Sequence, residues 1–393
     1  MHDWIKSRFI ELIGNIQNPK YQLVELNEIC EFIKDGTHQT PIYTEDRVNG
    51  FKFLSSKDVT SQKINWSNIK YIPKELHEQL YAKLSPKRGD ILLAKNGTTG
   101  VAAVVDSDEI FDIYVSLALL RPKSGVNVSY LCSALNSEDL KRQFNSSLKG
   151  IGVPNLHLRE IKKARIIFPP IDIQNKISSI TKQIDKSKFL LQQILEKFEL
   201  LKKSRFIEMF IEKRYPTASL DELSICGGEY GAQSSAIEYH PNRPRYVRIT
   251  DINEDGSLNN DYASSANIKD DEQYRLKYGD FLFARMGATV GKTYAYTFGD
   301  QIYAGYLIRY RLNLEKILPE YLFAFTRLNC YWKWVSINQN GAAQPGINAK
   351  KYGSLYVPVP PIEEQKKFIE LSQQIDKSKL IIQKALEDLV GKV

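Results

Sequence analysis

The sequence predicts an α+β chain in which one globular unit and one long helix are each present twice. Three observations lead to this prediction: short blocks of sequence recur in the same order, the block that opens the chain also closes a long patterned segment, and two segments carry a heptad pattern. The expected architecture is two α+β units related by an approximate twofold axis and separated by two long antiparallel coiled-coil helices, in a circular repeat.

Matched blocks define the repeat. The clearest pairs are "PPIDIQ" (169–174) with "PPIEEQ" (360–365), "QIDKSK" at 183–188 and again at 374–379, and "GDILLAKNGTTG" (89–100) with "GDFLFARMGATVG" (279–291). Weaker pairs are "FLSSKDV" (53–59) with "YVRITDI" (246–252) and "VELNEIC" (24–30) with "SLDELSIC" (219–226). Chance does not readily place these blocks in the same order, so we infer a duplicated unit.

The repeat is also predicted to be circular. "KSRFIE" occurs at 6–11, near the amino terminus, and at 203–208, where it ends the first patterned segment. The second patterned segment has no such block, so we expect the amino-terminal helix to complete it. The predicted parts are an amino-terminal helix (1–16), a first globular unit (17–170), a central helix (171–214), a second globular unit (215–361) and a carboxyl-terminal helix (362–393).

The two patterned segments are predicted to be helices that pair through a heptad seam, because their apolar residues recur in steps of three and four. The seam positions are Ile177, Ile180, Ile184, Ser187, Leu191, Ile194, Phe198 and Leu201 in the first segment and Phe368, Leu371, Ile375, Ser378, Ile382, Ala385 and Leu389 in the second. A lone helix over 171–213 would be roughly 60 Å long and would expose its seam. We therefore expect the two helices to pack antiparallel within one chain; intermolecular coiled-coil dimerisation is the alternative.

Each globular unit is predicted to be a curved sheet with one covering helix. Runs such as "YQLVELNEIC" and "GDILLAKNG" are rich in β-formers and are bounded by Gly, Asn and Asp, which is typical of strands. A helix is expected over 128–144, and its counterpart over 319–335. A loop rich in Gly, Asn and Pro and a last apolar strand then close each unit.

Composition narrows the class of protein. The net charge of +8 and the pI near 9.0 permit binding to a polyanion without establishing it. No apolar run reaches the roughly 18 residues of a membrane span, and charges within the first residues argue against a secretory signal. The cysteines (Cys30, Cys132, Cys226, Cys330) are scattered, so we expect buried free thiols, no zinc site and a reducing cytoplasm.

Catalytic motifs are not found in the sequence. There is no HExxH, no GxSxG and no Walker-type phosphate loop. "NPKY" (18–21) lacks the second proline of the Asn-Pro-Pro-Tyr motif of amino methyltransferases. The glycines of "GTTG" and "GATVG" are expected to serve backbone geometry. The isolated histidines His38, His77, His157 and His240 are expected to be surface or capping residues.

Polar loops rich in hydrogen-bond donors are the remaining candidates for function. Arg, Lys, Asn and Gln can read base edges, and Ser and Thr can hold phosphates. The loops differ most where the scaffold repeats, which suits two readers of different short DNA sequences; ordinary solvated turns are the alternative. The candidate DNA-binding residues are Thr37, His38, Gln39, Thr40, Ser55, Ser56, Lys57, Lys95, Asn96, Thr98, Thr99, Tyr230, Gln233, Ser234, Arg248, Thr250, Arg285, Thr289 and Lys292.

Together these features resemble the specificity (S) subunit of type I restriction-modification systems over essentially the whole chain. The resemblance rests on the two "GD…G" blocks, the "PPIDIQ" and "PPIEEQ" helix starts and "KSRFIEMF", all in the order described above. It implies that the globular units are target-recognition domains, each reading one half of a bipartite, asymmetric site in double-stranded DNA. It further implies that the helical pair fixes the gap between the half-sites and docks two methyltransferase (M) subunits.

The resemblance also implies that the chain has no catalytic centre and binds no cofactor itself. S-adenosylmethionine would belong to the M subunits, which methylate adenine, and ATP with Mg to the restriction (R) subunits; the complex would be cytoplasmic and no membrane is expected to take part. Two alternatives remain open. One is an enzyme that modifies DNA by itself, and the other is a coiled-coil scaffold that never touches DNA.

Overall fold

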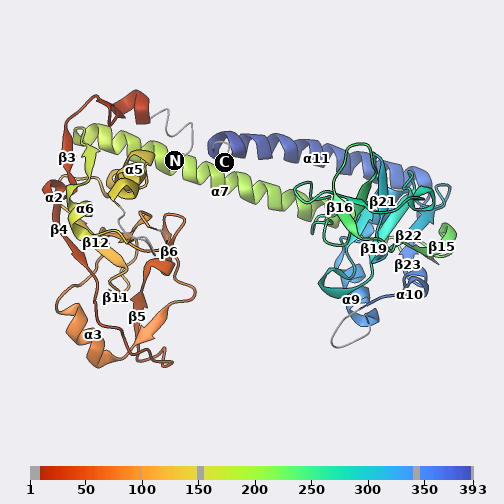
Figure 1. The fold of residues 1–393 in the computed structure, drawn as a ribbon, viewed down its shortest axis with the longest axis horizontal. Coiled ribbons are helices and arrows are strands. Elements are labelled where there is room, and N and C mark those ends of the chain that lie inside the picture. Colours follow the sequence, from red (N-terminus) through yellow and green to blue (C-terminus); the bar gives the residue numbers. More distant parts are fainter. Residues whose placement is uncertain (1–8, 98, 148–154, 340–345, 391–393) are drawn as a thin grey trace. The chain divides into compact units, whose positions relative to one another are not determined.

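The computed structural model describes residues 9–97, 99–147, 155–339 and 346–390 (Figure 1). The chain divides into two compact units: unit 1 comprises residues 1–192 and 383–393, and unit 2 comprises residues 193–382. Each unit combines short strands with helices, and each of the two long helices is divided between unit 1 and unit 2. The predicted α+β fold with a duplicated domain is confirmed, while the exact domain limits stay a prediction.

The globular part of unit 1 is built around two small sheets. An antiparallel sheet has the order β10 (Ala102–Val104), β9 (Ile91–Ala94), β12 (Leu117–Pro122), β4 (Cys30–Asp35). A second sheet has the order β11 (Phe111–Ile113), β5 (Phe51–Leu54), β8 (Lys70–Ile72), with β11 and β5 parallel. The remaining elements are β1 (Gly14–Asn15), β2 (Asn18–Pro19), β3 (Leu23–Glu25), α2 (Leu26–Ile29), η1 (Ser56–Asp58), β6 (Val59–Thr60), β7 (Lys63–Ile64), α3 (Lys74–Tyr81), α4 (Val128–Leu135), α5 (Glu138–Ser147), α6 (Leu158–Lys163) and β13 (Arg165–Ile167).

Unit 2 repeats this arrangement. Its antiparallel sheet has the order β15 (Ser224–Tyr230), β22 (Leu307–Leu312), β19 (Asp280–Ala284), β20 (Thr293–Ala295). These strands are the counterparts of β4, β12, β9 and β10, so the order is that of unit 1 read from the other edge. The parallel pair is β17 (Arg245–Val247) with β21 (Gln301–Tyr303). The remaining elements are η2 (Ile207–Ile211), β14 (Thr217–Ser219), β16 (Ala236–Glu238), β18 (Ser264–Ala266), η3 (Glu272–Tyr274), η4 (Gly287–Thr289), α8 (Pro319–Phe325), α9 (Asn329–Asn338), α10 (Ala349–Gly353) and β23 (Tyr356–Pro358).

The repeated "GD" block is explained by a buried ion pair. Asp90 follows the glycine in unit 1, is 1% exposed, and accepts two 2.8 Å hydrogen bonds from the Arg121 guanidinium on β12. In unit 2, the fully buried Asp280 accepts from Arg311 at 2.9 and 3.4 Å. A buried carboxylate needs such a partner, so the aspartate and the arginine recur together.

The repeated "PPI…Q" block ties each long helix to its globular unit. The buried Gln174 donates to Pro169 O (2.8 Å), and its side-chain oxygen accepts the backbone N–H at the N-cap of α4. The buried Gln365 donates in the same way to Pro360 O (2.9 Å) and accepts the N–H at the N-cap of α8. The amide thus satisfies backbone groups that would otherwise be buried without partners.

The long helices α7 (Ile171–Phe206) and α11 (Ile362–Val390) run antiparallel, as predicted. Within unit 2, Lys202 pairs with Asp376 at 2.9 Å and Glu199 pairs with Lys379, so one residue number falls as the other rises. Within unit 1, Leu389 of α11 packs against the hydrophobic cluster that includes Ile184 of α7.

The start of the chain takes the place that the circular repeat predicts. Residues 9–13 are helical, and Phe9 and Ile13 are buried in a cluster with Ile177 of α7. Their sequence counterparts, Phe206 and Phe210, are buried in the unit 2 cluster. The ring centroids of both lie within 5.7 Å of that of Phe368 on α11.

The predicted seam is confirmed at all seven positions of α11 and at five of its eight positions in α7. The positions at heptad spacing from Ile177 and from Phe368 are buried or half-buried. In α7, however, Ser187, Ile194 and Leu201 are exposed, and the half-buried positions lie one residue later, at Lys188, Leu195 and Lys202. Lys202 can occupy this position because its ammonium reaches Asp376 while its aliphatic stem stays against the helix.

The single helices predicted over 128–144 and 319–335 are each two helices. In unit 1 the chain turns at Asn136, whose buried amide exchanges two hydrogen bonds with Ala102 of β10 (3.0 and 2.9 Å). In unit 2, Arg327 lies at the equivalent turn and donates to Thr293 O of β20 (3.1 Å). In both units the side chain at the break is therefore bonded to the sheet.

Two expectations about single residue types need correction. Cys30 and Cys132 are buried, and burial raises the pKa of each thiol to about 12, but Cys226 is half-buried and Cys330 is exposed. His77 is not on the surface: its Nδ1 lies 2.7 Å from Asp112 Oδ2, and its ring stacks on Phe51 at 3.7 Å. Burial raises the pKa of the Asp112 carboxyl.

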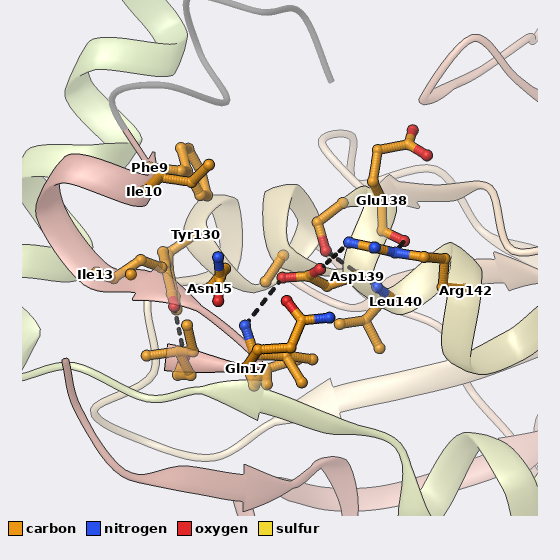
Figure 2. Close-up of a pocket in the computed structure, with 16 residues that line it drawn as sticks. Phe9, Ile10, Ile13, Asn15, Gln17, Tyr130, Glu138, Asp139, Leu140 and Arg142 are labelled. Atoms are coloured by element: carbon orange, nitrogen blue, oxygen red, sulfur yellow. Dashed lines mark hydrogen bonds and ion pairs between the residues drawn. The ribbon is translucent and has the colours of Figure 1, made fainter. Parts of the chain in front are cut away.

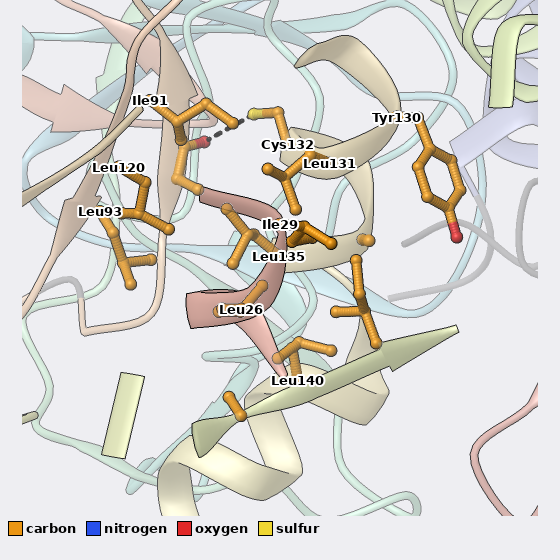
Figure 3. Packing of buried hydrophobic residues seen from close by; sticks show 14 of the residues in the cluster. Leu26, Ile29, Ile91, Leu93, Leu120, Tyr130, Leu131, Cys132, Leu135 and Leu140 are labelled. Atoms are coloured by element: carbon orange, nitrogen blue, oxygen red, sulfur yellow. Dashed lines mark hydrogen bonds between the residues drawn. The ribbon is translucent and has the colours of Figure 1, made fainter. Parts of the chain in front are cut away.

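The core of unit 1 lies between its antiparallel sheet and α4, as Figure 3 shows. Leu93 and Leu120 project from the sheet toward Leu131 and Leu135 of α4, and Leu26 of α2 closes one side. None of the helices in the described part of the chain is both long and apolar enough to span a membrane.

Candidate nucleic-acid interface

Three loops of unit 1 meet beside Ser116, the residue before β12. Its carbonyl accepts a hydrogen bond from Lys95 N (2.8 Å), and its hydroxyl accepts one from Ser56 N (3.0 Å). The adjacent Val115 N donates to Thr37 O (2.9 Å). The loops that follow β4, β5 and β9 are therefore brought to one place, as candidate DNA-contacting loops must be.

Two of these three contacts have a counterpart in unit 2, and a third backbone bond there holds the end of β17. Arg285 N donates to Tyr306 O (3.0 Å), Gly305 N to Ala232 O (2.8 Å) and Ala304 N to Val247 O (2.9 Å). Tyr306 thus occupies the position of Ser116, and its side chain is 54% exposed. The backbone frame is common to both units, and the side chains on it differ.

A glycine turn follows β9 in unit 1 and β19 in unit 2. Gly97 and Gly287 have φ of +70°, and the next glycine of each turn has φ of +85° or +86°. L-residues rarely adopt this conformation, so glycine is required for geometry. The expectation that "GTTG" and "GATVG" serve the backbone is confirmed by these angles.

A cationic side chain follows β9 in unit 1 and β19 in unit 2. It is neutralised in unit 1 and not in unit 2. Lys95 donates to Asp35 Oδ1 at 2.6 Å, and its side chain is only 6% exposed. The residue equivalent to Asp35 is Tyr230, and the Arg285 guanidinium lies 4.8 Å from its ring centroid. Arg285 Nε is buried and has no hydrogen-bond partner among the described residues. The two units therefore offer different chemistry at one shared position.

The loop after β5 in unit 1 and the equivalent loop after β17 in unit 2 each have one exposed residue at the tip. Asp58 accepts from Ser55 N (2.7 Å) and fixes the loop, which leaves Lys57 exposed. In unit 2, Asp251 accepts from Arg248 N (2.9 Å) and from its guanidinium, and Thr250 is the exposed tip. The hydrogen bonds that Arg248 donates to Asp251 raise the pKa of its guanidinium, so this arginine serves the loop.

The residues predicted from sequence fall into three groups. Those with exposed side chains are His38, Gln39, Thr40, Lys57, Tyr230, Gln233 and Thr250. Those whose side chains bond within or beside their own loops are Ser55, Lys95, Thr99, Ser234, Arg248, Thr289 and Lys292. Those that are half-buried at the loop junctions are Thr37, Ser56, Asn96 and Arg285. Thr98 lies outside the described residues. The assignment of these residues to DNA contact stays a prediction.

A basic groove beside Arg285 was not predicted from the sequence. It has a volume of about 560 Å³, and the residues that line it include Asn338, Asn348, Lys350 and Lys351. Among the described residues that line it there are three cations and no carboxylate. The signal was the "NAKK" run (348–351) that follows the second Gly-rich loop. Within the described ranges, no three His, Cys, Asp or Glu side chains gather as a metal site would require.

Comparison with known proteins identifies the family. A family model described as the type I restriction modification DNA specificity domain matches residues 18–200 and 234–390. The chain is 21% identical to the type I restriction enzyme MjaVIII specificity subunit of Methanocaldococcus jannaschii, over 96% of this chain and 91% of that protein. It is 21% identical to the EcoKI specificity subunit of Escherichia coli K12, over 86% of this chain and 78% of that protein.

Solved structures agree on the fold. A chain from a study of complex assembly and conformational transition of the type I R-M system matches with a TM-score of 0.64 at 17% identity, over 95% of each chain. The type I S subunit of M. genitalium matches with a TM-score of 0.51 at 12% identity, over 95% of this chain and 94% of that one. The chain therefore belongs to the type I restriction-modification DNA specificity family, as a specificity subunit with two recognition domains.

Proposed function

We propose that each unit of this specificity subunit reads one half of a bipartite, asymmetric site in double-stranded DNA. The observation that carries the proposal is one backbone frame used twice with different side chains: Lys95, which is held by Asp35, against Arg285, and the exposed Lys57 against Thr250. Backbone hydrogen bonds hold the loops in one geometry, and the exchanged side chains alter which base edges can be read. Two such readers in one chain suit two dissimilar half-sites.

The long helices would set the gap between the half-sites. α7 is one uninterrupted helix from Ile171 to Phe206, and both of its ends are anchored in hydrophobic clusters through Ile177 and Phe206. A continuous, anchored helix resists changes in length, because stretching it would break backbone hydrogen bonds. A fixed gap in the DNA site is the expected consequence.

The helices would also dock two M subunits. Phe189 and Leu190 are 58% and 46% exposed on α7, and their repeat counterparts Leu380 and Ile381 are 65% and 69% exposed on α11. Exposed apolar pairs of this kind mark interaction sites. Because the pair occurs once in each unit at equivalent positions, it suits two copies of one partner. S-adenosylmethionine would then be bound by the M subunits, and ATP with Mg by R subunits, with no cofactor on this chain.

Replacing Leu380 with aspartate is expected to remove one of the two M subunits, and replacing Phe189 with aspartate is expected to remove the other. A charge at the centre of a buried apolar contact is costly to desolvate. Native mass spectrometry of the complex co-expressed with its M subunit gives the stoichiometry. Lys377→Asp, an exposed polar position on the same helix as Leu380, should keep both copies. Retention of both copies in each apolar variant would contradict the docking proposal.

The function itself is tested by DNA binding and methylation. The chain with its M subunit is expected to bind DNA with an affinity that falls steeply with salt, because phosphate contacts release counterions. It should direct methylation of adenine in one bipartite motif, and exchange of residues 35–100 for those of another family member should alter one half of that motif only. Methyl transfer by the purified chain alone would identify an enzyme, and binding that is absent at every salt concentration would favour a scaffold.

A further inference from the structure

A pocket of about 260 Å³ lies in unit 1 between the amino-terminal segment and helices α4 and α5 (Figure 2). Phe9 and Ile13 line it from one side and Tyr130, Ala134 and Leu140 from the other. These side chains are apolar apart from the tyrosine hydroxyl, which donates to a backbone carbonyl. These five side chains give the pocket an apolar part, and the rest of the lining includes the polar side chains of Asn15, Gln17, Ser137, Glu138, Asp139 and Arg142.

The rim of the pocket is held by specific bonds. Ile16 N, in the β1–β2 turn, donates to Asp139 Oδ2 (3.3 Å), and Asp139 pairs with Arg142 at 2.5 Å (Figure 2). Gly14, with φ of +78°, allows the chain to leave the helix and form this hairpin. Unit 2 has a π-helical turn, η2, at the corresponding point. The hairpin and its contact with α5 thus belong to unit 1 alone.

Unit 2 shows what normally fills this space. Tyr130 and Tyr321 are equivalent, since each donates to a carbonyl of the last strand of its unit. Four residues after each tyrosine, unit 1 has Ala134 and unit 2 has Phe325. Ten residues after, unit 1 has a leucine and unit 2 has Tyr331. Smaller side chains in unit 1 leave the space open.

The amino-terminal side of the pocket differs in the same sense. Ile13 corresponds to Phe210, whose ring packs edge-on against Tyr321 at 5.0 Å. Phe325 lies in the same cluster, with its ring centroid 6.4 Å from that of Phe206. Aromatic rings of the chain itself therefore close the space in unit 2, which indicates that an aromatic ring is the shape that unit 1 lacks.

We propose that the unit 1 pocket receives one aromatic side chain from the M subunit that docks on unit 1. The proposal rests on the docking function argued above and names a contact within it. Ile10, which also lines the pocket, is 42% exposed, and its counterpart Ile207 is 39% exposed, so apolar surface is repeated beside both equivalent positions. A buried aromatic anchor in a preformed pocket is the usual centre of a protein interface. The copy on unit 2 would find the equivalent space occupied by Phe325.

Filling the pocket tests the proposal. Ala134→Phe, made in the Leu380→Asp background so that only the unit 1 site remains, is expected to weaken binding of the M subunit by between about tenfold and a hundredfold, the range for burying one large apolar side chain. Asn145→Phe adds the same ring at an exposed position of α5 that does not line the pocket, and it should bind like the parent. Binding is measured by titration of the full chain with the M subunit, and melting curves confirm folding.

A probe provides the second measurement if Ala134→Phe folds poorly. Free indole should raise the melting temperature of the otherwise unaltered chain, which a ligand of the folded state must do, and saturating indole should weaken binding of the M subunit. Unchanged binding in Ala134→Phe, or no competition by indole, would overturn the pocket proposal while leaving docking intact. Failure of the unaltered chain to bind any M subunit would overturn the proposed function and the pocket proposal together.

Discussion

Replacement of Arg121 with methionine is expected to lower the free energy of unfolding of unit 1 by about 3–5 kcal/mol, the usual cost of leaving a buried charge without its partner. Asp90 would lose both 2.8 Å hydrogen bonds from the guanidinium and keep one from Lys87 N. Methionine fills a similar volume, so the lost charge dominates the effect. The arginine also lies over the ring of Phe32 at 4.7 Å, and the flexible thioether can keep part of that contact.

A matched pair in the same unit provides the control. Arg88 makes an equally well-formed two-point contact with Asp108, at 2.9 and 2.8 Å, but the two side chains are 57% and 80% exposed. Arg88→Met should therefore leave the unfolding curve unchanged, because water and salt screen an exposed pair. Urea denaturation followed by fluorescence gives the comparison, and hydrogen exchange of the β9 and β12 amides assigns the loss to unit 1. Equal effects of the two substitutions would contradict the argument from burial.

The sequence could predict the frame because the frame is made of local signals that occur twice. The glycine after each central strand, the aspartate of each "GD" block and the proline pair before each helix have fixed backbone roles, so their recurrence reveals the repeat. The order of the blocks then predicts the circular repeat, in which Phe9 packs in unit 1 as Phe206 packs in unit 2. These features need no knowledge of long-range contacts.

Contacts between residues far apart in the chain could not be predicted from the sequence pattern. The partner of Lys95 is Asp35, sixty positions earlier, so the sequence could not tell that this lysine is neutralised. The burial of His77 depends on Asp112 of another strand in the same way. The seam positions of α7 missed Leu195 because apolar residues fill both position 194 and position 195, so the pattern alone does not choose between them.

Replacement of Arg285 with alanine is expected to weaken binding to the cognate DNA site by about tenfold to a hundredfold and to relax the preference at one base of one half-site. Arg285 is half-buried, stacks on Tyr230, and has no carboxylate partner among the described residues. A guanidinium held in this way can present its outer nitrogens to the two acceptors of a guanine. Lys95 offers no such group at the equivalent position of unit 1, because Asp35 already holds its ammonium.

The form of the loss separates base reading from charge. Lys350→Ala removes a cation from the same groove and should weaken binding to all sequences alike, with a salt slope lower by about one. Arg285→Lys keeps the charge of the arginine but loses its planar fork, so it should retain most of the salt slope and still lose the base preference. Competition binding with a library of half-site variants at fixed salt measures both quantities. A uniform loss in Arg285→Ala, with every base preference intact, would show that this arginine contacts phosphate, because only contact with a base edge makes the loss depend on sequence.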